Sequence, residues 1–307
     1  MPDQNYSNNT LISIIIPCFN HATYLKKAID SVLQQSHKNV EIIVVDDESS
    51  DNTKEVAESY GAPVKYIFKE NGGLSAARNT GLEYINGNYV VFLDADDWLY
   101  PDALQINLNY LLQNPKAAFV SGGFDRVNLE ENTIEEKVRQ IEKDHYIEFL
   151  QGNYVGVPAA VLYSRWILEK FKFNVAAPDS CGDYDLYLNI TRSYPVVHHQ
   201  EKIAAYRIHG ANMSSNSPMM LASVLQVLKQ QEKKLKTPRE REAYEFGFQV
   251  WKNYYCSELY YKLRKRKIKP TFQILATLLK YKPTLLIKYI LLNNIVVSKK
   301  LTYKRIG

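Results

Sequence analysis

The sequence predicts an α/β fold with a doubly wound, mostly parallel sheet covered by helices on both faces, and an all-helical C-terminal extension. Three observations support this prediction. Short apolar runs alternate with segments of helical periodicity in the first third of the chain, several runs end in acidic residues, and only helical patterns follow residue 217. Strands that alternate with helices at this spacing are typical of a parallel sheet buried on both sides.

The period of the apolar residues predicts the individual elements. We expect strands at 11–17, 40–45, 64–68, 89–93, 117–120 and 159–163. Helices are expected at 22–35, 51–61, 74–85 and 184–192, with a further helix beginning at Pro101. Asp51 and Pro101 are typical of helix starts, and Gly61 is typical of a helix end.

The charge of the chain changes sign along the sequence. Residues 1–217 hold 18 Lys and Arg against 28 Asp and Glu, whereas residues 218–307 hold 20 against 5. This asymmetry predicts a boundary between an acidic α/β domain at 1–217 and a basic helical region at 218–307. Proline residues divide the second region into separate helices.

The composition excludes several classes of protein. An apolar content of 46% with 23% charged residues is typical of a folded globular chain. Three widely separated cysteines predict neither a disulfide framework nor a cysteine-based zinc site. The N-terminal residues do not resemble a signal peptide, and no apolar run reaches the roughly 20 residues of a membrane span. We therefore expect a cytoplasmic chain, either free or peripheral at the inner face of the cell membrane.

Acidic residues follow two of the predicted strands, at the edge of the sheet where ligands bind in such folds. Asp94 and Asp96 point to the same side of an extended segment, and paired carboxylates suit Mg²⁺ or Mn²⁺. The alternative is that these acids form a turn and cap the next helix. An Asp-x-Asp sequence alone does not distinguish the two interpretations.

Four motifs together resemble the inverting glycosyltransferases of family 2, which have the GT-A fold. They are Ile14–Asn20 (IIIPCFN), Val44–Asp51 (VVDDESSD), Asn71–Asn79 (NGGLSAARN) and Phe92–Asp97 (FLDADD). The motifs match in order and spacing, and the resemblance covers about residues 10–210. Four motifs in sequence are far more specific than any one of them.

The resemblance implies a nucleotide-sugar donor, with UDP favoured. It assigns the base to the backbone of Pro17 and to the carboxylate of Asp47, and the metal to Asp94 and Asp96. Glycines that open a helix allow backbone amides to approach an anion. Arg78 is assigned to the diphosphate or base, although a surface ion pair is an alternative. The residues assigned to the nucleotide sugar are Pro17, Phe19, Asn20, Asp47, Asn71, Gly72, Gly73, Arg78, Asp94, Ala95 and Asp96.

Two further segments extend the resemblance. Cys181–Leu188 resembles the second acidic motif of the family, which implies that Asp183 is the catalytic base; capping of its own helix is the alternative. The Tyr-Arg-Ile-His segment ending at His209 resembles the one that closes the catalytic region. It implies that His209 contacts the metal and Arg207 the diphosphate, although His209 could also pack locally. Trp98 is a candidate for the sugar or acceptor pocket, or a core residue.

The sequence thus predicts transfer of a sugar from a nucleotide-sugar donor to a hydroxyl of a glycan or lipid-linked acceptor in cell-surface glycan biosynthesis, with Mn²⁺ or Mg²⁺. The alternatives are an inactive glycosyltransferase-like binding protein and a sugar nucleotidyltransferase. An anionic membrane surface is a further predicted partner, because the basic region also contains an apolar stretch at Leu285–Val297. Nucleic acid is not an expected partner, although the basic run Lys262–Lys269 is the feature that would bind it.

Overall fold

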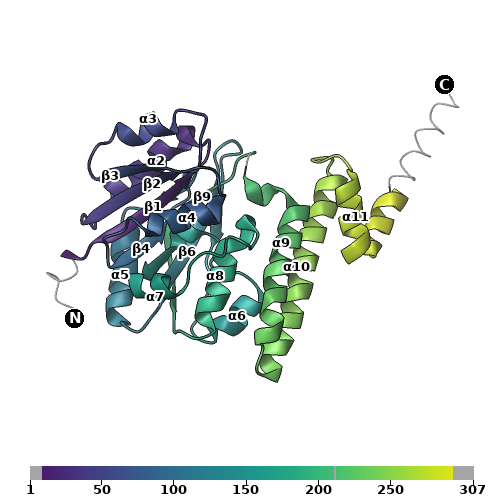
Figure 1. Cartoon of the computed structure of the whole chain (residues 1–307). Helices are drawn as coiled ribbons and strands as arrows, with labels where there is room; N and C mark the ends of the chain where they lie inside the picture. The colour runs from purple at the N-terminus through teal and green to yellow at the C-terminus, as the bar shows by residue number, and fades with distance from the viewer. Residues whose placement is uncertain (1–8, 211, 293–307) are drawn as a thin grey trace. The chain divides into compact units, whose positions relative to one another are not determined.

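The structure is a computed structural model that describes residues 9–210 and 212–292 (Figure 1). These residues form two compact units. The first runs to Phe149 and resumes from Asn153 to Asn212, and the second comprises Leu150–Gly152 and the chain from Met213 onward. The division therefore falls shortly before the change in charge at residue 217.

Within the described residues, the first unit is built on a nine-stranded sheet. Its strands are β1 (Ile12–Cys18), β2 (Val40–Asp46), β3 (Val64–Phe68), β4 (Tyr89–Phe92), β5 (Trp98–Leu99), β6 (Phe119–Asn128), β7 (Thr133–Lys137), β8 (Val161–Ser164) and β9 (Val197–Arg207). They lie in the order β3-β2-β1-β4-β8-β6-β9-β5, with β7 paired to β6. All seven residues of β1 are buried, as expected for a strand near the middle of a covered sheet.

The predicted α/β class is confirmed, but the sheet is mixed. Strands β3, β2, β1 and β4 are parallel, and so are β6 and β9. Strand β8 runs antiparallel to both β4 and β6, and β5 runs antiparallel to β9. Antiparallel neighbours need no crossover helix, which is why the alternating pattern is lost in the second half of this unit.

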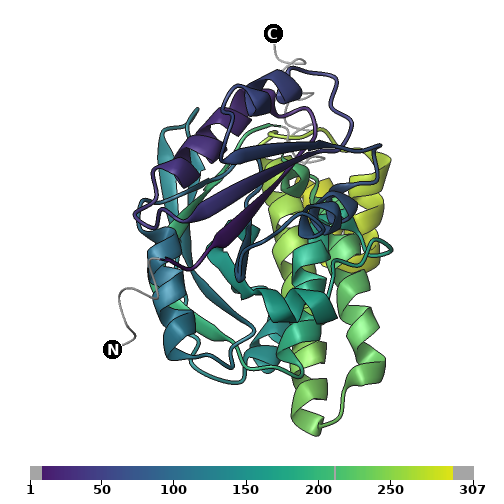
Figure 2. The same ribbon diagram turned by 60° about the vertical axis from the view of Figure 1, so that its left-hand side comes forward.

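Seven helices of the described chain lie wholly or mainly in the first unit. They are α2 (Ala22–Leu33), α3 (Thr53–Glu58), α4 (Leu74–Leu82), α5 (Ala103–Gln113), α6 (His145–Gln151), α7 (Arg165–Lys170) and α8 (Gly182–Thr191). Right-handed crossovers set α2 and α3 on one face of the parallel strands and α4 on the other (Figure 2). The helix expected from Pro101 begins at Ala103 instead, and the Pro101 carbonyl accepts a hydrogen bond from Ser36.

The described part of the second unit is mainly helical. It contains α9 (Ser217–Gln231), α10 (Pro238–Arg264) and α11 (Phe272–Tyr281), and residues 283–292 are also helical. Thr237 and Glu240 form a capping box at the start of α10, and Pro238 is its first residue. Over the described residues, no helix is both long and apolar enough to cross a membrane. The predicted apolar stretch Leu285–Val297 lies partly outside the described residues.

Candidate active site

The end of β1 carries the first predicted nucleotide-binding residues. Pro17 is buried in the strand opposite Val45 of β2, whereas the side chain of Phe19 is exposed. Asn20 has a positive φ of 55°, and its side-chain oxygen accepts hydrogen bonds from the backbone and hydroxyl of Ser50 at 2.8 and 3.1 Å. These bonds fix the β1 loop against the β2 loop at the carboxyl edge of the sheet.

Asp47, which directly follows β2, contacts the start of α4. Its buried carboxylate pairs with Lys69 at 2.5 Å and accepts hydrogen bonds from the amides of Gly72 and Gly73 at 3.0 and 2.9 Å. The side-chain amide of Asn71 donates to the Asp47 carbonyl at 3.1 Å. The structure therefore brings together the predicted donor-binding residues of these two segments, and adds Lys69.

Asp179 supplies an anion at the N-terminus of α4. Its carboxylate accepts hydrogen bonds from the amides of Leu74 and Ser75 at 3.1 and 3.0 Å, which satisfies donors that a helix start leaves unpaired. Gly73 has a φ of 86°, and a Cβ there would lie 2.3 Å from an Asp179 oxygen. Position 73 therefore requires glycine. The four backbone amides from Gly72 to Ser75 all donate to carboxylates of the chain itself.

The two acids of the Asp-x-Asp motif have different partners. Strand β4 ends at Phe92, and a turn follows in which the Asp97 amide donates to the Asp94 carbonyl at 3.0 Å. The segment is not extended, so the alternation that sets Asp94 and Asp96 on one side does not apply. Asp94 forms an ion pair with Arg78 at 2.7 Å, and Arg78 is buried instead of lying on the helix surface. The intervening Ala95 is buried.

Asp96 is bonded to the segment that ends β9. His209 Nε2 lies 3.0 Å from Asp96 Oδ2, and the Asn212 amide donates to the same oxygen at 3.4 Å. Arg207 donates from Nε to the Asp96 carbonyl at 2.7 Å and from its backbone amide to the Asp97 carboxylate at 2.9 Å. An imidazole nitrogen beside a partly exposed carboxylate is a donor set that can hold a divalent cation.

Two aromatic rings contact the guanidinium of Arg207. Its central carbon lies 5.0 Å from the ring centroid of Tyr24 and 4.9 Å from that of Trp98, which are cation–π distances. Lys27 approaches the same Trp98 ring at 5.7 Å. Trp98 is half-buried at the edge of the site and orients a cationic side chain.

Asp183 lies in the first turn of α8 and is partly exposed. Burial raises the pKa of Asp183 to about 6; Arg78 opposes this rise, whereas the negative charge of Asp94 adds to it. A carboxyl group with a pKa near 6 is close to the range in which general bases operate at neutral pH. The neighbouring acid, Asp185, is almost fully buried.

Several residues of this site were not predicted from the sequence, and Tyr24 is one of them. Lys69 follows β3, and His21, whose ring centroid lies 5.9 Å from that of His209, follows Asn20 after β1. Their position after strand ends was an available signal. Asp179 and Asn212 contact residues more than 100 positions away in sequence, and no local pattern could identify them.

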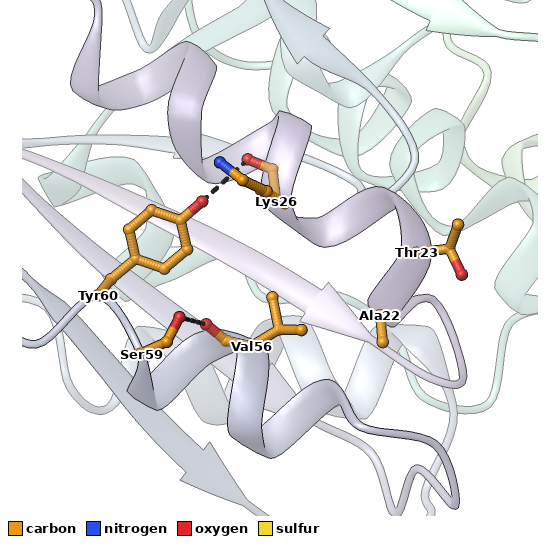
Figure 3. Close-up of a pocket in the computed structure, with 6 residues that line it drawn as sticks. All are labelled: Ala22, Thr23, Lys26, Val56, Ser59 and Tyr60. Carbon is orange, nitrogen blue, oxygen red and sulfur yellow. Dashed lines mark hydrogen bonds between the residues drawn. The ribbon is translucent and has the colours of Figure 1, made fainter.

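A cavity of about 430 Å³ lies between α2 and α3 (Figure 3). It is lined by Ala22, Thr23, Lys26, Val56, Ser59 and Tyr60. The Tyr60 hydroxyl donates to the carboxylate of Asp30 at 2.7 Å. No residue predicted for donor binding or catalysis lines this cavity, so we assign it no part in the chemistry.

The fold and the site define the GT-A class, in which a mixed α/β sheet carries acidic residues at the carboxyl edge of its strands. The chain belongs to glycosyl transferase family 2, whose model matches residues 13–171.

Curated relatives are named as glycosyltransferases. The chain is 35% identical to an uncharacterized glycosyltransferase of Haemophilus influenzae over 214 residues, which cover 68% of this chain and 84% of that protein. It is 32% identical to the Escherichia coli UDP-Glc:alpha-D-GlcNAc-diphosphoundecaprenol beta-1,3-glucosyltransferase WfgD, over 67% of this chain and 80% of WfgD. It is 35% identical to the uncharacterized glycosyltransferase RC0461 of Rickettsia conorii over 66% of this chain, but the match spans only 34% of RC0461.

Solved structures agree on the fold. Staphylococcus aureus TarS in complex with UDP-GlcNAc matches with a TM-score of 0.61 and 16% identity, over 88% of this chain and 80% of that one. The mannosyltransferase PcManGT of Pyrobaculum calidifontis, in complex with GDP-Man and Mn²⁺, matches with a TM-score of 0.59 and 16% identity, over 91% and 86%.

Proposed function

We propose that this chain is an inverting, metal-dependent glycosyltransferase that moves a sugar from a nucleotide-sugar donor, preferably a UDP-sugar, to a hydroxyl of a glycan or lipid-linked acceptor. The observation that carries the proposal is Asp183, a carboxyl with a raised pKa that interacts with the Arg78–Asp94 pair of the Asp-x-Asp motif. Family membership and the nucleotide-sugar donors named for WfgD and TarS support it.

In the proposed reaction, Asp183 removes the proton of the acceptor hydroxyl. The hydroxyl oxygen of the acceptor attacks the anomeric carbon from the face opposite the leaving group. Asp96 and His209 would hold Mn²⁺ or Mg²⁺, which supplies charge stabilisation for the leaving diphosphate. The guanidinium of Arg207, which contacts the rings of Tyr24 and Trp98, is a second cation for that charge. Arg78 balances the charges of Asp94 and Asp183.

The donor preference rests on Asp47, whose carboxylate would accept a hydrogen bond from the uracil imide once it exchanges its present amide partners. The direct test is thermal stabilisation of the chain by UDP-, GDP- and dTDP-sugars in the presence of Mn²⁺. We expect the largest shift with a UDP-sugar. A larger shift with a GDP-sugar, the class of donor bound to PcManGT, would reject the UDP assignment and keep the glycosyltransferase proposal.

The transfer rate is expected to fall as the pH is lowered through about 6, because a protonated Asp183 cannot accept the acceptor's proton. The acid limb of a kcat/KM profile reports this ionisation in the free enzyme. Circular dichroism over the same range controls for unfolding. A folded enzyme whose kcat/KM stays constant to about pH 4.5 would contradict the role of Asp183.

Arg78→Gln is expected to move this acid limb to higher pH, because the guanidinium lowers the pKa of Asp183. The substitution also breaks a buried ion pair, so the free energy of unfolding should fall by about 3–5 kcal/mol. Arg78→Lys keeps the charge and is the matched control. The midpoint of the acid limb of its kcat/KM profile should lie near that of the wild type. Unchanged midpoints in both variants would show that Arg78 does not tune the base.

We also propose that the basic helical unit contacts an anionic membrane surface, where a lipid-linked acceptor would be held. Its charge is strongly positive, and Phe272, Leu279 and Ile287 expose 89%, 62% and 56% of their surface. Full-length protein should sediment with anionic vesicles at low salt, and less so at high salt. A Phe272→Ser/Leu279→Ser double variant should bind less. Equal sedimentation with neutral vesicles would reject electrostatic binding.

A further inference from the structure

We infer that His21 is a third protein ligand of the divalent cation, beside Asp96 and His209, and that this donor set makes the site selective for a transition-metal ion such as Mn²⁺ over Mg²⁺. The inference rests on the proposed function, because the ion is the one that would assist transfer. It goes beyond that proposal by adding a ligand and by deciding between the two ions.

Three separate parts of the chain bring these ligands together. His21 directly precedes α2, Asp96 lies in the turn after β4, and His209 follows β9. One donor atom from each lies within 4.8 Å of the other two, and none of the three residues is highly exposed. Metal bonds of about 2.1 Å set neighbouring ligand atoms about 3 Å apart, so the proposal includes a small inward movement of the side chains.

The imidazole of His21 is not used to cap the helix that it precedes. His21 occupies the N-cap position of α2, but its side chain forms no capping hydrogen bond. The first amide of α2, that of Ala22, donates instead to the carboxylate of Asp51 at 2.9 Å. An N-cap residue whose capping role is filled by another side chain can direct its own side chain to a ligand.

Aromatic contacts orient the His21 ring toward the cluster. It lies edge-on to the ring of His209, with centroids 5.9 Å apart, and edge-on to Tyr24 at 5.7 Å. Tyr24 also packs against His209, with ring centroids 4.8 Å apart. Packing that restricts both imidazoles lowers the entropy that metal binding must overcome, as in a preorganised site.

The chemistry of the donors decides the ion. Mg²⁺ prefers oxygen ligands and water, whereas imidazole nitrogen suits transition-metal ions. A site with two imidazoles and one carboxylate therefore favours Mn²⁺ over Mg²⁺ and leaves other coordination positions for water and phosphate oxygens. A site built from paired carboxylates alone would show no such preference.

The test measures Mn²⁺ binding to the full-length chain without nucleotide. Binding is detected as the loss of the electron paramagnetic resonance signal of free Mn²⁺, and Mg²⁺ is added as a competitor. Wild-type protein should bind Mn²⁺ at least about tenfold more tightly than Mg²⁺, and His21→Ser should weaken Mn²⁺ binding by about tenfold or more. Serine is a favourable N-cap residue, so this variant should remain folded. Thr23→Ala, an exposed position of α2, is the matched control and should bind as the wild type does.

His21→Asp provides a second, independent readout. Aspartate is also a favourable N-cap residue and offers a hard oxygen ligand, so the variant should still bind metal but lose most of its preference for Mn²⁺. The inference is overturned if wild-type protein binds no Mn²⁺, or if His21→Ser retains wild-type affinity. UDP binding, measured separately, distinguishes the two proposals. A chain that binds Mn²⁺ through His21 but binds no nucleotide keeps this inference and loses the proposed function.

Discussion

Replacing Asp183 with Asn is expected to lower the rate of sugar transfer by about 10²–10⁴, the usual contribution of a general base. The amide cannot accept the proton of the acceptor hydroxyl, yet it has nearly the same shape as the carboxyl group. The substitution alters neither the proposed metal ligands, Asp96 and His209, nor the proposed base-binding residue Asp47, so donor binding should remain. The measurement pairs steady-state transfer with calorimetric titration of UDP.

The same variant should be more stable than the wild type at neutral pH. Folding raises the pKa of Asp183 from 3.8 to about 6, so ionisation of this carboxyl group increasingly opposes folding between about pH 4 and 6, and the full penalty is present above about pH 6. A shift of this size corresponds to about 3 kcal/mol, which the variant should gain at pH 7 and lose as the pH falls toward 4. Asp185→Asn, on the same helix, is the control for catalysis.

An inactive Asp185→Asn variant beside a normally active Asp183→Asn variant would show that Asp185, and not Asp183, is the catalytic base.

Asp96→Asn is expected to abolish the metal-dependent part of nucleotide binding. Asp96 is the carboxylate of the described cluster with His21 and His209, and the amide that replaces it carries no charge. At a hundredfold excess over its dissociation constant, UDP with Mn²⁺ should stabilise the wild-type fold by about 2.7 kcal/mol. Thermal denaturation should show this stabilisation largely lost in the variant.

Asp102→Asn is the matched control, because Asp102 is exposed and precedes α5. It should keep the full stabilisation by UDP with Mn²⁺. If Asp96→Asn behaves as this control does, the cation is not held by Asp96. Transfer by Asp96→Asn should also fall sharply, because the leaving diphosphate loses its counter-charge.

The parallel half of the sheet and its strand-end residues could be predicted, because its strands are mainly apolar and β1, β2 and β3 are each followed by a helix. Strand β1 was expected at 11–17 and is Ile12–Cys18, and β3 is the expected 64–68. The antiparallel half of the sheet was harder to predict from the sequence. Strand β6 was expected at 117–120 but runs from Phe119 to Asn128. The prediction was too short because buried polar residues such as Ser121 and Asp125 interrupt the apolar pattern of the strand.

The candidate site shows the same limit. The acids at strand ends were assigned from local pattern, and Arg207 and His209 from the resemblance to family 2. The structure brings Asp96, Arg207 and His209 into contact. The partners of Asp94 could not be inferred, because the turn after β4 and the burial of Arg78 depend on tertiary packing. The sequence suggested open amides at the start of α4, but Asp179, from a distant segment, occupies two of them.

The most direct test of the central claim is a calorimetric titration of UDP into the wild-type chain, once with Mn²⁺ and once with a chelator in its place. The proposed site predicts tight binding with Mn²⁺ and binding at least about tenfold weaker with the chelator. Asp96, His209 and His21 would hold the ion, and its charge would stabilise the diphosphate. Equal UDP affinity in both titrations would contradict the metal-dependent mechanism, and no UDP binding in either would contradict the choice of a UDP-sugar donor.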